Sequence, residues 1–85
     1  MKGLFFMDDP QPNPAGDQVT VRFINNYEQP ISYQMIDELG NTRLRGVTGE
    51  DALTLDVSQL PEGVYFFRAF TSGGVSVSRE ILILR

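Results

Sequence analysis

The chain has 85 residues, enough for one small domain, and 41% of them are apolar and 21% charged, as is typical of a folded globular protein. It contains no histidine and no cysteine, which excludes the serine–histidine–aspartate triad, cysteine nucleophiles, disulfides and nearly every structural zinc site. Its net charge of −4 argues against nucleic-acid binding, which needs a basic surface, and no apolar run approaches the roughly 20 residues that span a bilayer.

The first part of the chain combines a weak strand pattern with a proline-rich entry. We interpret residues 1–9 as a linker, a tag or a weak first strand, for which Gly3–Met7 is the fitting segment. Residues 8–17 hold three of the five prolines, so they are predicted to be extended or turning rather than helical. Within them, Asp8–Gln11 is either a plain solvated linker or part of the entry. A single domain is expected over residues 10–85.

After the entry, short runs of alternating apolar and polar residues are separated by turn signals. This period of two is the mark of half-buried strands, and Gly, Pro or Asn interrupts every candidate helix. The expected strands are 18–23, 31–35, 42–47, 53–57, 64–70 and 75–84. Among the turns, Asp37–Asn41 places Gly40 or Asn41 at a positive φ, and Thr71–Gly74 forms a hairpin.

Six or seven short strands at regular spacing predict an all-β fold, an immunoglobulin-like antiparallel β-sandwich of about seven strands. A five-stranded barrel is the alternative. The segment Leu60–Tyr65 fits the tyrosine corner of such sandwiches. The corner predicts that Leu60 fills the core, that Gly63 takes a conformation closed to other residues, and that the Tyr65 hydroxyl bonds the backbone just upstream.

The carboxylates lie in turn-like pairs, where acids cap and solvate the chain. These pairs are Asp8–Asp9, Asp37–Glu38 and Glu50–Asp51. A catalytic pair needs a pocket and perturbed pKa values, and the chain offers few other groups that could act as a base. A weak calcium site at a turn is an alternative, although no Asp-x-Asp-x-Asp-Gly loop is present. We therefore expect no enzyme, no cofactor and no metal.

The arginines and the last strand carry the remaining signals. Most arginines are interpreted as exposed strand charges that prevent aggregation at sheet edges. Arg68 differs because it interrupts an otherwise apolar strand, so it either pairs with an acid or lies beside a functional surface. The terminal run Glu80–Arg85 is apolar on both faces, and core packing explains only one of them.

Four segments, taken in chain order, resemble the C-terminal sorting domain of the type IX (Por) secretion system. Pro12–Ala15 is similar to that family's Pro-Asn-Pro opening, and Met35–Asn41 to its apolar-Asp-x-x-Gly turn. Leu55–Arg68 resembles its most characteristic stretch, Leu-x-x-Gly-x-Tyr followed by two apolar residues and a basic one. Ser78–Arg85 looks like its terminal strand, a basic residue followed by apolar ones.

The resemblance implies that the domain is a sorting signal and not a catalyst. Such a domain ends a cargo protein that is in the periplasm in transit and then at the cell surface or secreted. The outer-membrane type IX translocon recognises the domain, and a sortase removes it by cleavage upstream of Pro12. The implied signal residues are Gly63, Tyr65, Arg68, Ile81, Leu82, Ile83, Leu84 and Arg85, with the entry Pro12, Asn13 and Pro14 and the turn residues Asp37 and Gly40.

Two further expectations concern partners and the alternative function. If the last strand lies at a sheet edge, its unpaired backbone groups could receive a strand from the translocon, and the same edge allows an edge-strand dimer. The alternative function is a generic immunoglobulin-like adhesion or spacer module that binds a protein or a glycan, because a sandwich fold does not choose among functions.

Overall fold

The computed structural model describes residues 5–25 and 30–85 of the chain. These residues form seven antiparallel strands and contain no helix. The strands are β1 (Phe5–Met7), β2 (Gln18–Asn25), β3 (Ile31–Asp37), β4 (Thr42–Thr48), β5 (Ala52–Asp56), β6 (Gly63–Phe70) and β7 (Ser76–Ile83). Their bounds differ from the predicted ones by three residues at most, which is the usual uncertainty where a strand frays into a turn.

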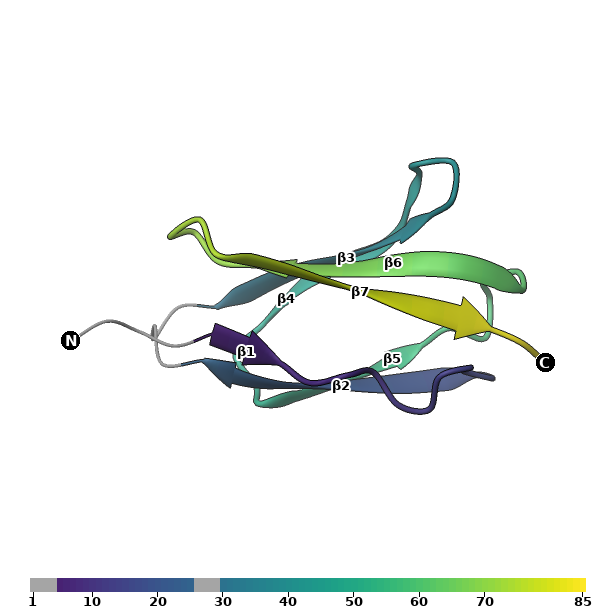
Figure 1. The fold of residues 1–85 in the computed structure, drawn as a ribbon, viewed down its shortest axis with the longest axis horizontal. Coiled ribbons are helices and arrows are strands. Elements are labelled where there is room, and N and C mark those ends of the chain that lie inside the picture. The colour runs from purple at the N-terminus through teal and green to yellow at the C-terminus, as the bar shows by residue number, and fades with distance from the viewer. Residues whose placement is uncertain (1–4, 26–29) are drawn as a thin grey trace.

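The strands form two sheets that face each other, one of three strands in the order β1-β2-β5 and one of four in the order β4-β3-β6-β7 (Figure 1). The predicted immunoglobulin-like sandwich is therefore confirmed, and the barrel alternative is wrong. The β6 strand lies between β3 and β7, as expected from its apolar sequence, and β7 forms an edge of its sheet.

The core lies between the two sheets and is built from every second residue of each strand. In β6, Tyr65, Phe67 and Ala69 are buried, while Phe66 and Arg68 are exposed on the outer face. Phe67 has the largest side chain among the fully buried residues that the structure describes. The outer face of β6 is thus open to solvent although its sequence is apolar.

The β1 strand and the chain after it pack onto the domain. Met7 is fully buried, and the Phe5 ring stacks on Phe23 of β2 with their centroids 6.2 Å apart. The Asp8 amide bonds the Arg22 carbonyl at 2.9 Å. The weak first strand is therefore present, its first two predicted residues lying outside the described part, and the chain after it bonds β2 through the Asp8 amide.

Candidate functional site

The tyrosine corner closes the loop between β5 and β6. The Tyr65 hydroxyl donates a hydrogen bond of 2.6 Å to the Pro61 carbonyl, and the Tyr65 side chain is buried. Gly63 has a φ of 152°, which side-chain-bearing residues rarely adopt, and Leu60 is buried in the core. The corner predicted from the sequence is confirmed in all three respects.

The corner makes a simple stability prediction. Tyr65→Phe keeps the ring in the core but removes the hydroxyl, so the Pro61 carbonyl loses its partner. We expect the free energy of unfolding to fall by about 1 kcal/mol and the melting temperature by about 4–8 °C. Thermal denaturation followed by circular dichroism measures this shift. An unchanged melting temperature would contradict a stabilising role of the hydrogen bond.

The entry motif lies along the outer edge of β7. The Asn13 side-chain amide donates to the Glu80 carbonyl at 2.9 Å, and its carbonyl oxygen accepts from the Leu82 amide at 2.9 Å. Ala15 continues the pairing, because its amide donates to the Leu82 carbonyl at 2.7 Å and its carbonyl accepts from the Leu84 amide at 2.9 Å. The side chain of Asn13 therefore acts as a short strand partner for β7.

This pairing corrects one expectation about β7. The strand does lie at a sheet edge, but its backbone groups between Glu80 and Leu84 are not unpaired, because Asn13 and Ala15 occupy them. Strand addition by a receptor at this half of β7 would first have to displace the entry segment. Sequence spacing alone could not show this, since the partners lie 67 to 69 residues apart.

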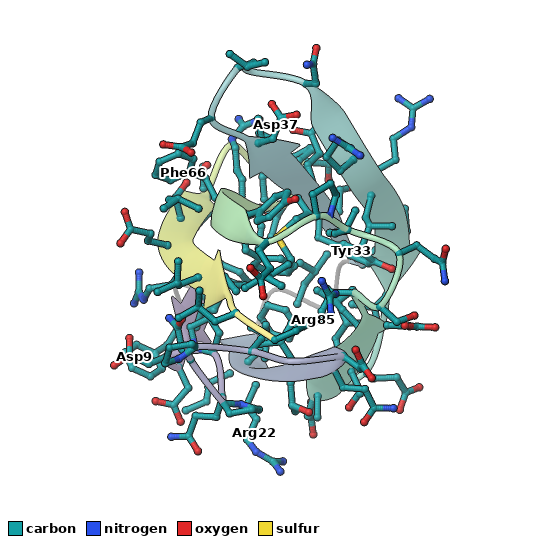
Figure 2. All side chains as sticks on the ribbon, turned by 90° about the vertical axis from the view of Figure 1, so that its right-hand side faces the viewer. Asp9, Arg22, Tyr33, Asp37, Phe66 and Arg85 are labelled. Atoms are coloured by element: carbon teal, nitrogen blue, oxygen red, sulfur yellow. The ribbon has the colours of Figure 1, made fainter. Side chains whose placement is uncertain are left out.

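Arg85 fastens the end of the chain to the corner loop. Its guanidinium donates to the carbonyls of Leu60, at 2.6 Å, and Val57, and its Nε lies 3.1 Å from an Asp17 carboxylate oxygen. The Arg85 amide also donates to the Glu62 carboxylate at 2.6 Å. The Arg85 side chain, labelled in Figure 2, thus contacts two backbone carbonyls of the loop after β5 and one acid of the entry segment.

Arg79 joins β7 to the N-terminal segment through hydrogen bonds and an ion pair. Its Nη2 donates to the Met7 carbonyl at 3.0 Å, and its Nε lies 3.3 Å from an Asp9 carboxylate oxygen. Its Nη1 donates to the Ser78 carbonyl at 3.0 Å. The two sheets are thereby joined along one side, because β7 belongs to one sheet and β1 to the other.

The structure brings most of the implied signal residues together, but not all of them. The entry motif, the corner and the terminal strand meet at the end of the sandwich where the chain terminates (Figures 1 and 2). Arg68 lies away from this end, on the outer face of β6 opposite Gln34 of β3. Asp37 and Gly40 belong to the turn between β3 and β4, which Figure 1 shows projecting from the sandwich.

Asp37 organises that turn as an acceptor. One of its carboxylate oxygens accepts from the amides of Leu39 and Asn41, both at 2.9 Å, and the other lies 3.3 Å from the Arg43 guanidinium. The Asn41 amide is the main cause that holds the pKa of Asp37 below its ordinary value, with Arg43 and Leu39 adding to it against the effect of burial. Gly40 has the predicted positive φ, 87°.

These contacts predict a pH-dependent turn. Because the pKa of Asp37 is lower in the folded than in the unfolded chain, its stabilising effect is fully present above the ordinary pKa of 3.8. The effect is lost as the pH falls through the lower folded value. We expect the amide resonances of Leu39 and Asn41 to shift together in this range in an NMR titration. The same titration of Asp37→Asn should show no such step, and a step that persists would contradict the assignment.

Some contacts of the site have no signal in the sequence. Arg79 and Arg85 stand out there only as strand charges or as part of a motif, and their acceptors are mostly backbone carbonyls, which every residue possesses. Glu62 and Asp17 have the appearance of ordinary turn acids, and only the fold places them beside the end of the chain.

The described part of the chain contains no helix that is long and apolar enough to cross a membrane.

The fold and these contacts define an immunoglobulin-like module. Its entry motif, corner and last strand are joined by hydrogen bonds at one end of the sandwich, which we call the bonded end. Comparison with protein families gives a match over residues 11–84 to the secretion system C-terminal sorting domain. The chain belongs to this family. No curated protein matched the chain. The sequence resemblance is therefore confirmed, and the domain is a sorting signal for type IX secretion, not an enzyme. Its family implies recognition by the type IX machinery and a cargo that is secreted or at the cell surface.

Proposed function

We propose that the type IX machinery binds the end of the sandwich at which the entry motif, the corner and the terminal strand meet, and that it does so while the cargo is in transit through the periplasm. The observation that carries this proposal is the bonding of Asn13 and Ala15 to β7 together with that of Arg85 to the corner loop. Motifs that are far apart in the chain form one surface only in the folded domain. The signal residues of this surface are Pro12, Asn13, Pro14, Gly63, Tyr65, Ile81, Leu82, Ile83, Leu84 and Arg85.

The roles within this surface follow from burial. Tyr65, Ile81 and Ile83 are buried, so they support the surface from beneath and do not touch a receptor. Leu84 is 51% exposed and offers an apolar contact beside the exposed prolines of the entry motif. A receptor that contacts Leu84 therefore also contacts the entry segment, and it binds both only when that segment is folded against β7.

A sortase would remove the domain upstream of Pro12. Gln11 supports this placement, because its amide and carbonyl both bond Thr20 of β2, at 2.9 and 2.8 Å. A protease needs an extended chain free of such bonds, so the cut is expected before the bonded Gln11 and after Asp8, whose amide bonds Arg22. An edge-strand dimer through β7 would have to use its Ser76–Ser78 half or displace Asn13 and Ala15, so we place any self-pairing of β7 outside the recognition end.

The test is a transport assay with the whole chain fused to the C-terminus of a reporter that carries a cleavable signal peptide. Surface and medium reporter are compared between a host with an intact type IX translocon and one without it. Export in the first host alone is expected, and the mass of the released reporter locates the cleaved bond. Reporter held in the periplasm of both hosts, with the domain folded, would contradict recognition by this machinery.

A matched pair of variants tests the placement of the surface. Leu84→Asp puts a charge into the proposed interface, whereas Ile24→Asp makes the same change at a side chain that is also 51% exposed but lies on β2 of the other sheet. We expect export to fall about tenfold or more for Leu84→Asp only, because an apolar side chain at the centre of an interface supplies much of the binding energy. Equal export of the two variants would exclude Leu84 from the recognition surface.

A further inference from the structure

The outer face of the four-stranded sheet carries a basic row that the recognition end does not include. Strand register places Arg45 of β4, Gln34 of β3 and Arg68 of β6 side by side across the sheet, and both arginines are exposed. Neighbouring strands lie about 4.8 Å apart, so the two arginines, two strands apart, stand about 10 Å from each other. They flank Gln34 from opposite sides.

Among the described residues, these two arginines have no acidic partner, unlike three other arginines. Arg43, Arg79 and Arg85 each lie within 3.3 Å of a carboxylate oxygen. Arg22 is the third arginine without such an ion pair in the described part of the chain, but it lies on the other sheet. The row is therefore basic on a chain whose net charge is −4, although the exposed Glu80 of β7 lies on the same face opposite Phe66. Edge protection accounts for Arg45 on the edge strand β4, but not for Arg68 on the interior strand β6.

The Arg68 side chain is held in a defined position. Its guanidinium lies over the Phe70 ring, 4.6 Å from the centroid, and its Nε donates to the Ser76 hydroxyl at 3.2 Å. Stacking of this kind leaves the edge of a guanidinium free to donate to a carboxylate. A pre-positioned arginine loses less conformational freedom when it binds an anion than a free one does.

A shallow hollow lies next to this basic row, and it is lined by Ser32 and Gln34 of β3, Arg45 and Val47 of β4 and Phe70 of β6, with further contributions from the chain around them. The short side chain of Ser32 stands between the larger Val47 and Phe70, its direct neighbours in the strand register. Val47 is 65% exposed. The hollow therefore combines an apolar wall with a cationic one.

We propose that this face binds an acidic segment of a partner protein, whose carboxylates are held by Arg45 and Arg68 and whose apolar neighbours pack on Val47 and Phe70. Arginine and aromatic residues are the usual centres of protein interfaces, and the charge of the row selects an acidic partner. The proposal rests on the proposed function, in that the partner is a component of the export machinery, which binds here in addition to the recognition end.

Cross-linking in cells tests the proposal. The reporter fusion carries the photo-reactive residue p-benzoyl-phenylalanine in place of Val47. Irradiation is expected to give an adduct whose cross-linked partner peptide contains Asp or Glu next to apolar residues. The double variant Arg45→Glu with Arg68→Glu should reduce the adduct about tenfold or more, and changing those partner acids to lysine should restore it. Arg22→Glu is the matched control, because Arg22 lies on the other sheet (Figure 2).

Four outcomes would overturn the inference: an adduct unchanged in the double variant, a cross-linked peptide without acids, an adduct with a second copy of the fusion, or no adduct.

The single variant Arg45→Glu guards against an effect on folding. Arg68 contacts Ser76 and Phe70, so its replacement can disturb the fold, whereas Arg45 makes no such contact among the described residues. The melting temperature of each variant shows whether it is folded. Translocon-dependent export with an adduct that ignores the arginines would refute this inference alone. An arginine-dependent adduct without export would refute the proposed function alone.

Discussion

Phe67→Ala is expected to remove a large part of the stability of the domain. Phe67 is fully buried at the centre of the core, and truncating such a side chain costs about 3–5 kcal/mol. Small domains are stable by only roughly 0.05–0.15 kcal/mol per residue, or about 4–13 kcal/mol for an 85-residue chain, so this loss is a large part of the margin. Urea denaturation followed by circular dichroism measures the loss, and export of a Phe67→Ala fusion should disappear with the fold.

The neighbouring residue provides the control for this prediction. Phe66 has the same side chain but points to the outer face, where it is 41% exposed. Phe66→Ala should therefore lower the free energy of unfolding by less than about 1 kcal/mol, as is usual for surface positions. Similar losses for the two variants would contradict the assignment of inner and outer faces in β6.

Arg85→Ala is expected to have the second largest effect. It removes the guanidinium donor that the carbonyls of Val57 and Leu60 share, although the Val57 carbonyl still accepts from the Leu60 amide, and it removes the ion pair with Asp17. Hydrogen bonds to charged groups are each worth about 1.5–3 kcal/mol, and partial exposure of Arg85 places the expected loss at about that of one such bond. The melting temperature reports this loss, and hydrogen exchange at the Leu60 amide should become faster as the loop loosens.

Arg85→Lys distinguishes geometry from charge at the same position. Lysine keeps the positive charge, but its single ammonium cannot reach two carbonyls and a carboxylate in the fixed arrangement of a guanidinium. We expect it to recover only a minor part of the lost stability. Full recovery would mean that Arg85 acts through its charge near Asp17 and not through the carbonyls of the corner loop.

The strands and the corner could be predicted because their signals are local. Alternation in Val19–Phe23 marks which side chains face the core, and the run Leu60–Tyr65 contains every residue of the corner within a few positions. The outer face of β6 was harder. Its sequence is apolar apart from Arg68, yet no element of the described structure covers Phe66, which is 41% exposed. A strand sequence tells which residues alternate, and it does not tell whether the second face is packed.

The bonded end of the sandwich could be predicted only as a set of motifs. The contacts of Asn13 with Glu80 and Leu82, and of Arg79 with Met7, join residues about 70 positions apart. Their acceptors and donors are largely backbone groups, which carry no residue-specific signal. The expectation that the end of β7 offers free backbone groups was wrong for this reason, because the group that occupies them is a side-chain amide that mimics a strand.

The burial of Met7 affects what the proposed cleavage would do to the domain. It lies outside residues 11–84, the span shared with the family, yet it is fully buried and its carbonyl accepts from Arg79. A cut between Met7 and Gln11 would leave β1 attached to the departing cargo. The remaining fragment would have an open slot along β2 and a weaker hold on β7 at Arg79. The domain that remains after such a cut would lack part of its core, so we expect it to be less stable than the intact domain.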